Sequence, residues 1–383
     1  MGKKPRTTQK ARPKRNINNE RNVEGYKNFT TKKAKDSRKT NKSDSRKTRD
    51  FNEIRLDYLQ NPPLSDFAQC MLPQYAFNSI ANKNDSTESH RNALQAHFGK
   101  ASALPFNFSA GGFAEIFLQF KSIYFPPTLH YEIRRALDIV RPFVKQIAID
   151  STKKISECDN ALRTDIYKDE TLIIAPLIDE DIFALNEIPE IRNATLALDI
   201  SYALALGLEE VYTACQKAHI AVANATPLGL PRDFGLILSD KIYTSTIHKN
   251  GVSEAFLGAI NERRAKIANT TQNLSFFDAL KSHFGKDIDL FSRDFAPHTL
   301  PLRFRHINTR YLIEHLYLEN IFAQPAQDCA LGFVKPSHTL LSQGFSPLQA
   351  RELCAVSFET LENVDALAQK LFESYKMIRL MEF

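Results

Sequence analysis

The sequence predicts a mostly α-helical protein, with a single helical globular body at residues 51–383 preceded by a disordered basic arm at residues 1–50. Three observations support this fold class. Only 13 of the 383 residues are glycine, whereas sheets joined by tight turns need many glycines. Several segments of the body repeat apolar residues at helical spacing. The first fifty residues have few apolar side chains, so they cannot offset the entropy of ordering by burial.

The helical segments of the body share apolar side chains that recur every three or four residues. Phenylalanines follow this spacing between 104 and 125 and are expected in the core. A short apolar run at 172–174 is compatible with a strand, and Pro and Gly residues predict a loop at 226–234. The expected helical ranges, in chain order, are short interrupted patterns within 51–98, a long helix kinked at Pro142 over 128–149, 194–224 as the strongest pattern, 253–267, 309–322, a helical hairpin over 346–363, and an amphipathic helix over 358–378.

The arm and the body carry opposite net charges. Residues 1–50 hold 18 of the chain's 50 Lys and Arg and 5 of its 44 Asp and Glu, a net charge of +13. The remaining 32 basic and 39 acidic residues give 51–383 a net charge of −7. Lys and Arg near phosphates release condensed counterions, which gives affinity without sequence specificity. We therefore expect the arm to bind nucleic acid, either RNA or DNA.

The candidate nucleic-acid contacts of the arm are Lys and Arg side chains, namely Lys3, Lys4, Arg6, Lys10, Arg12, Lys14, Arg15, Arg38, Lys39, Arg46, Lys47 and Arg49. Alternative uses of the arm are a nuclear address, a solubilising tail or a membrane-surface segment. In the body, the alternation around Phe304 predicts an extended segment that places Arg303 and Arg305 on one face, with Arg310 just beyond. Pairing with local carboxylates such as Glu314 is the alternative for these three arginines.

Motifs for catalysis, cofactors or metals are missing from the sequence. It has no GxGxxG, P-loop or GxSxG pattern, and its five cysteines form no CxxC pair. Residues 292–299 resemble the Asp-x-Ala-Pro-His stretch of cyclic amidohydrolases, but the His-x-His pair of that family is absent. Asp179, Glu180 and Asp181 carry the oxygen ligands that a hard cation would need, but three consecutive carboxylates cannot all face one ion on a helix, so they are interpreted as a solvated turn. We expect no catalytic residues, no cofactor and no metal site, and these observations favour a non-enzyme over an enzyme.

Composition also bears on location. The apolar stretch 194–225 is interrupted by charged residues and fails as a membrane span. The N-terminus has no apolar signal segment, and the odd number of cysteines is typical of reduced thiols. We expect an intracellular protein, in cytoplasm, nucleus or virion, that is not secreted and does not enter a membrane.

These observations favour a non-enzymatic structural protein of the coat or nucleocapsid kind. In this hypothesis the basic arm neutralises phosphates, and the helical body self-assembles as a homo-oligomer. One alternative is a chromosomal, ribosomal or plasmid-maintenance factor that the arm anchors to nucleic acid. Another is an enzyme acting on nucleic acid with the arm as its tether.

Overall fold

In the computed structural model, the unit formed by residues 51–383 is built from both β-strands and α-helices. The basic arm, with all of its candidate contacts, lies outside the described residues. The structure describes residues 53–66, 85–149, 170–188, 191–232, 234–241, 252–266, 272–326 and 335–381.

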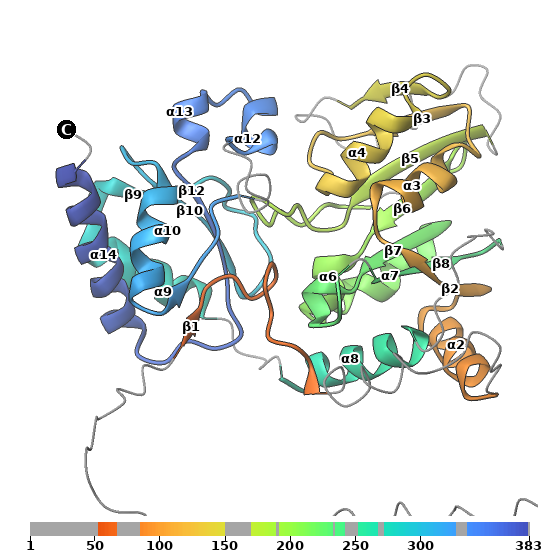
Figure 1. Cartoon of the computed structure of the whole chain (residues 1–383), viewed down its shortest axis with the longest axis horizontal. Helices are drawn as coiled ribbons and strands as arrows, with labels where there is room; N and C mark the ends of the chain where they lie inside the picture. Colours follow the sequence, from red (N-terminus) through yellow and green to blue (C-terminus); the bar gives the residue numbers. More distant parts are fainter. Residues whose placement is uncertain are drawn as a thin grey trace, which may run out of the picture. The chain divides into compact units, whose positions relative to one another are not determined.

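A seven-stranded mixed sheet is the main feature of this unit (Figure 1). Its strand order is β2-β8-β7-β6-β5-β3-β4. Strands β3 to β7 run parallel, whereas β8 is antiparallel to both of its neighbours, β2 and β7. The bounds are β2 (Ser102–Asn107), β3 (Ser122–Phe125), β4 (Lys145–Ala148), β5 (Thr171–Pro176), β6 (Thr195–Asp199), β7 (Ile220–Asn224) and β8 (Phe234–Ser239). The predicted single helical body is therefore wrong, and the fold class is α/β.

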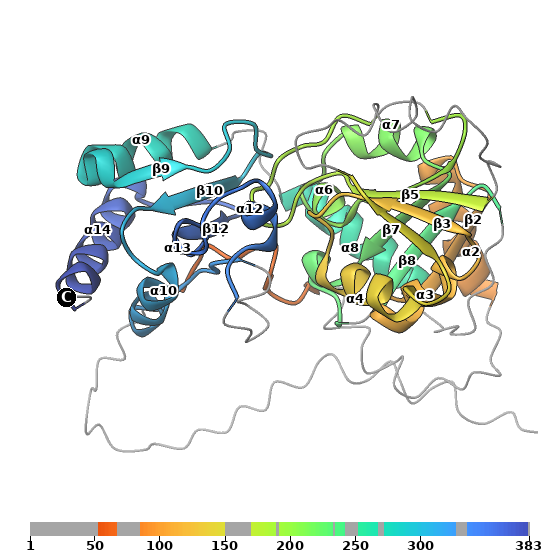
Figure 2. The ribbon, with the colours of Figure 1, turned by 90° about the horizontal axis from the view of Figure 1, so that it is seen from above.

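Helices cover both faces of this sheet, with α7 on one side and α3 and α4 on the other (Figure 2). Side chains of β5 show the two faces, because Ile173 and Ala175 join one core cluster and Leu172 and Ile174 the other. The first cluster includes side chains of α2 (Asp85–Phe98), α6 (Ser201–Ala205), α7 (Glu210–Lys217) and α8 (Val252–Lys266). The second includes α3 (Ala110–Phe117), α4 (Tyr131–Val140) and the expected phenylalanine core.

The C-terminal third adds a smaller antiparallel sheet of order β12-β10-β9. Its core is shared with α9, α10 and α14, and β1 pairs in parallel with β11 beside it. The bounds are β1 (Ile54–Arg55), α9 (Asn273–Phe284), η3 (Gly285–Asp287), β9 (Ile288–Leu290), β10 (Thr299–Phe304), α10 (Thr309–Leu318), β11 (Ile321–Phe322), α12 (His338–Ser342), α13 (Pro347–Ala350), β12 (Leu353–Ser357) and α14 (Val364–Met381).

The strongest predicted helix, 194–224, is instead a strand, two short helices and a second strand. Strands β6 and β7 lie inside the sheet with both faces covered, so their apolar residues form unbroken runs instead of alternating. Such runs cannot be distinguished from buried helices by periodicity alone. Gly207, at φ +63°, separates α6 from α7. The short strand at 172–174 is confirmed as part of β5.

Two further predicted helices are corrected in the same way. The helix over 128–149 ends at Val140, and the chain passes Pro142 and enters β4. Proline lacks the N–H that would continue a helix, so it terminates this one instead of kinking it. The helical hairpin over 346–363 is also wrong, because β12 occupies its centre with all five residues buried. Within the described residues, no helix is long and apolar enough to cross a membrane.

Candidate functional site

A cavity of about 190 Å³ opens at the carboxyl ends of the parallel strands. Ligands of open α/β sheets bind at this edge. Its lining combines aromatic rings, amides and carboxylates, and comes from Leu59, Gln60, Asn61, Phe108, His130, Tyr131, Glu132, Glu180, Tyr202, Asn224, Thr226, Pro227, Arg232, Gln324, Ala326 and Ala355. The volume lies below the roughly 300–1,000 Å³ of sites for drug-sized ligands, so a small metabolite would fit best.

Three consecutive carboxylates follow β5, where the chain turns beneath this cavity. Asp179, Glu180 and Asp181 are each at most 7% exposed. Asp179 Oδ1 accepts the backbone N–H groups of Asp181 and Ile182 at 2.8 and 2.9 Å, which fixes the turn. Asp181 Oδ2 accepts a hydrogen bond from the Ser337 hydroxyl at 2.6 Å. The solvated turn expected from the sequence is therefore wrong, because these acids are buried.

Burial raises the pKa values of Glu180 and Asp179. Loss of water around Glu180 raises the pKa of its carboxyl well above the usual value, and the neighbouring carboxylates, Asp199 first, raise that pKa further. The pKa of Asp179 is raised to about 7 by burial and by the charge of Asp181. Of the three, Glu180 lines the cavity. A buried carboxyl with a raised pKa in a cavity is a candidate acid–base group.

His130 stands beside Glu180 as the N-cap of α4. Its Nδ1 accepts the backbone N–H of Glu132 at 3.0 Å. Burial, and secondarily the charge of Arg134, lowers the pKa of His130 to about 3, so the ring is neutral. Since Nδ1 accepts, the single proton lies on Nε2, which is 3.8 Å from Glu180 Oε1. The His130 Nε2–H thus lies near the Glu180 carboxyl, beyond hydrogen-bond distance, and 3.5 Å from Asn224 Nδ2.

A short series of hydrogen bonds connects the ends of β6 and β7. Asp199 Oδ1 accepts hydrogen bonds from the backbone N–H and the hydroxyl of Ser201. The Ser201 oxygen in turn accepts the Asn224 N–H at 2.8 Å, and Asn224 Oδ1 accepts the Thr226 N–H at 3.0 Å. Burial raises the pKa of Asp199 to about 6, against the lowering effect of the Ser201 bonds. These hydrogen bonds hold Asn224 and Thr226 at the cavity wall.

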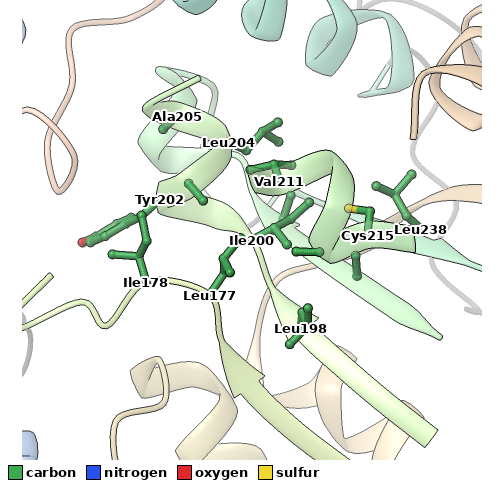
Figure 3. Packing of buried hydrophobic residues seen from close by; sticks show 14 of the residues in the cluster. Leu177, Ile178, Leu198, Ile200, Tyr202, Leu204, Ala205, Val211, Cys215 and Leu238 are labelled. Atoms are coloured by element: carbon green, nitrogen blue, oxygen red, sulfur yellow. The ribbon is translucent and has the colours of Figure 1, made fainter. Parts of the chain in front are cut away.

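Tyr202 lines the cavity from the start of α6. Figure 3 shows its ring next to Ile178 and its hydroxyl at the outer end, directed away from the apolar cluster. The residue is 7% exposed, and within the described residues its hydroxyl makes no hydrogen bond. Buried tyrosine hydroxyls usually find a partner. The Tyr202 hydroxyl is therefore a polar group of the cavity wall that a ligand could contact.

The N-terminus of α3 is occupied by a side chain of the protein. Glu132 Oε2 accepts the Ala110 N–H at 2.7 Å. The turn before α3 is tight, since a Cβ on Gly112 would lie 2.0 Å from the Asn107 carbonyl oxygen. The positive end of this helix is thus already matched by a carboxylate. Glu132 lines the same cavity as Glu180, and Arg232, whose Nη2 donates to Asn61 Oδ1 at 3.3 Å, is the guanidinium of the lining.

The three body arginines predicted to contact nucleic acid do not reach this cavity. Arg303 lies in the extended strand β10, as expected, and its Nε is 2.6 Å from Glu352 Oε2. Arg305 is 2.7 Å from Asp289, and Arg310 is 3.0 Å from Glu314. Each guanidinium thus has a carboxylate partner, as in the pairing alternative.

Other candidate chemistry is limited in the part of the chain that the structure describes. No group of three or more His, Cys, Asp or Glu side chains there could hold a metal ion. Cys215 and Cys354 are buried, and burial raises the pKa of each thiol to about 12, so neither is a nucleophile at neutral pH.

The residues of the cavity were missed in the sequence because they come from distant segments. A signal did exist: polar residues directly follow three apolar runs, at 179–181, at Asp199 and at Asn224. Had those runs been assigned to parallel strands, their carboxyl ends would have been expected to meet. The helical interpretation of 194–224 concealed this.

Comparisons with known proteins identify solved structures that have the same fold. No protein-family model and no curated protein matches the sequence. Solved structures do match: a NifS-like protein from Rickettsia africae, at 15% identity and TM-score 0.66, covers 85% of this chain and 99% of its own. A cysteine desulfurase from Thermococcus onnurineus, at 12% identity and TM-score 0.63, covers 85% and 95%. SspA in complex with cysteine, at 11% identity and TM-score 0.62, covers 80% and 99%. The chain shares the fold of these proteins.

This fold overturns the function expected from the sequence. The coat or nucleocapsid hypothesis required a helical self-assembling body without a site, whereas the chain has an α/β fold similar to that of cysteine desulfurases and a cavity with buried acids. Nucleic acid as the partner, and the virion and nucleus as locations, depended on that hypothesis and are withdrawn with it. The homo-oligomer stays a prediction.

Proposed function

We propose that the cavity binds a small amine of the amino-acid type and that Glu180 exchanges a proton with this ligand, as the acid–base group of an enzyme. The observation that carries this proposal is the buried Glu180 carboxyl, which lines the cavity and has a strongly raised pKa. A buried carboxyl with a raised pKa is suited to act as an acid–base group. One solved neighbour in this fold is described as a complex with cysteine, an amino acid.

The lining suits a ligand that carries a positive charge. Glu132 and Glu180 contribute carboxylates, and Phe108, Tyr131 and Tyr202 contribute rings. Carboxylates and ring faces both attract ammonium groups, and the attraction is stronger where water is excluded. Arg232 lines the same cavity, so a ligand carboxylate has a cation available.

The proton balance of binding follows from the raised pKa. In the free site the raised pKa favours the protonated form of Glu180, because its charge would be buried among other carboxylates. An ammonium group beside it favours the ionised form. Binding therefore releases this proton to solvent, and Glu180 becomes a carboxylate that can accept a proton from the ligand. His130, which stays neutral, offers its Nε2–H to the new charge.

Calorimetric titration with L-alanine, L-cysteine and propionate tests the proposal. The two amino acids should bind and propionate, which lacks the amine, should not. Glu180→Gln should weaken amino-acid binding at least tenfold, because it removes the charge that pairs with the ammonium. Glu373→Gln, at an exposed position in α14, is the matched control and should change nothing. Equal binding of propionate and alanine, or unchanged binding by Glu180→Gln, would refute the proposal.

A further inference from the structure

Chemistry at an amino-bearing carbon is often supplied by pyridoxal phosphate, which raises the question of whether this cavity could hold it. That cofactor stabilises carbanions, is linked to the protein as a Schiff base on a lysine, and has an acidic or basic partner at its ring nitrogen. Its phosphate needs hydrogen-bond donors, for which a helix N-terminus is the usual source. Each requirement can be compared with the residues present.

The lysine is missing from the cavity. None of the described residues that line it is a lysine. The buried lysine of the described chain is Lys100, whose Nζ donates to the Ala218 carbonyl and to Asp240 Oδ1. Ala218 precedes β7 and Asp240 follows the antiparallel β8. Lys100 therefore lies at the amino ends of the parallel strands, at the opposite edge of the sheet from the cavity.

The place for a phosphate is also taken. The Ala110 N–H at the start of α3 is donated to Glu132 Oε2 at 2.7 Å, and Ser109 Oγ accepts the Gly112 N–H at 3.3 Å. A phosphate at this helix end would have to displace Glu132. It would then lie beside the displaced Glu132 carboxylate, which lines the same cavity. Like charges at short range in a site of low dielectric repel strongly.

One part of the requirement is met. Asp199 ends β6 and is buried, as a partner of a ring nitrogen would be, but Oδ1 is already engaged by Ser201. An acid alone holds neither the aldehyde carbon nor the phosphate of the cofactor. The donor set therefore does not fit pyridoxal phosphate.

We propose that this chain keeps the fold of the desulfurase-like enzymes but does not hold pyridoxal phosphate, because no lysine lies among the described residues of the cavity and the Glu132 carboxylate occupies the N-terminus of α3, where a phosphate would bind. Glu132 acts as a positioning residue: it fixes the start of α4 against that of α3 and gives the cavity its preference for cations. The inference stands on the Glu132 contact and the absent lysine, so it does not depend on which amine binds.

Incubation of the full-length protein with pyridoxal phosphate at equimolar concentration tests whether the chain holds this cofactor. After reduction with borohydride, peptide mapping by mass spectrometry locates any lysine adduct. We expect no dominant adduct within 51–383, and the same scattered surface adducts with pyridoxal, which lacks the phosphate. One stoichiometric lysine adduct in 51–383, formed with pyridoxal phosphate and not with pyridoxal, would overturn the inference.

The Glu132→Ala variant tests whether Glu132 keeps phosphate from the N-terminus of α3. The probe is inorganic phosphate in a calorimetric titration. The freed Ala110 N–H and the loss of one negative charge should raise phosphate affinity at least tenfold over the unaltered protein. Glu115→Gln, in α3 but outside the cavity lining, should leave the phosphate affinity unchanged. Glu132→Gln keeps an oxygen acceptor for the Ala110 N–H, so it tests the charge alone if the alanine variant fails to fold. Unchanged phosphate affinity in the folded variant would contradict the assigned role of Glu132.

Discussion

Replacing Asp179 by asparagine should change how the stability of the folded chain depends on pH. Burial and the charge of Asp181 raise the pKa of Asp179 from 3.8 to about 7. Between these values the folded chain holds a proton that the unfolded chain has released. The free energy of unfolding is therefore highest at low pH and falls as pH rises toward 7. Asparagine has no proton to lose, so it removes this dependence.

The magnitude follows from the size of the shift. About three units at about 1.4 kcal/mol each give about 4 kcal/mol as the full cost of ionising Asp179 in the folded chain. Between pH 5 and pH 8, ionisation of Asp179 lowers the free energy of unfolding of the unaltered chain by about 2.5 kcal/mol. The asparagine oxygen can still accept the N–H groups of Asp181 and Ile182. Its amide nitrogen would stand where Oδ2 lacks a partner among the described residues, at a pH-independent cost of about 1–3 kcal/mol.

Urea unfolding of the unaltered chain and of Asp179→Asn at pH 5 and pH 8 measures this effect. The difference in unfolding free energy, variant minus unaltered chain, should increase by about 2.5 kcal/mol between the two pH values. Glu373→Gln, at an exposed position, should show no such increase. A difference that stays constant within about 0.5 kcal/mol, beyond the usual extrapolation error, would refute the assignment of a raised pKa to Asp179.

Three further predictions concern the cavity and the body. Tyr202→Phe should weaken amino-acid binding about 5- to 10-fold, the worth of one hydrogen bond, without lowering the melting temperature; unchanged affinity in calorimetry would show that the hydroxyl does not contact the ligand. With its pKa lowered to about 3, His130 should show constant imidazole NMR shifts between pH 5 and 8, and a midpoint near the ordinary value would contradict its neutral state. Glu352→Ala should cost about 3 kcal/mol in urea unfolding, because the Arg303 side chain is only 15% exposed; a loss below about 0.5 kcal/mol would show that the pair contributes little.

The sequence predicted local features better than the arrangement of the chain. The phenylalanines of 104–125, the strand at 172–174 and the extended segment at Arg303 were expected and are present. These depend on side chains close in sequence. The sheet depends on pairing between segments far apart, and both faces of its strands are buried. An unbroken apolar run such as 194–198 carries no period that distinguishes a strand from a buried helix.

The cavity could not be predicted for a related reason. Its key contacts join residues that are distant in sequence, such as Glu132 to Ala110, His130 to Glu180 and Ser337 to Asp181. The three acids at 179–181 have the composition of a surface turn, and only the packing around them shows that they are buried. Charge counting directed attention to the arm, which lies outside the described residues, and away from the acids of the body.

The central claim is that Glu180 exchanges a proton with a small amine in the cavity. Its most direct test is the number of protons released when L-alanine binds at neutral pH, obtained from calorimetric titrations in buffers of different ionisation enthalpy. The account predicts net proton release by the unaltered protein, and none by Glu180→Gln. Proton uptake, or the same release by the variant, would contradict it.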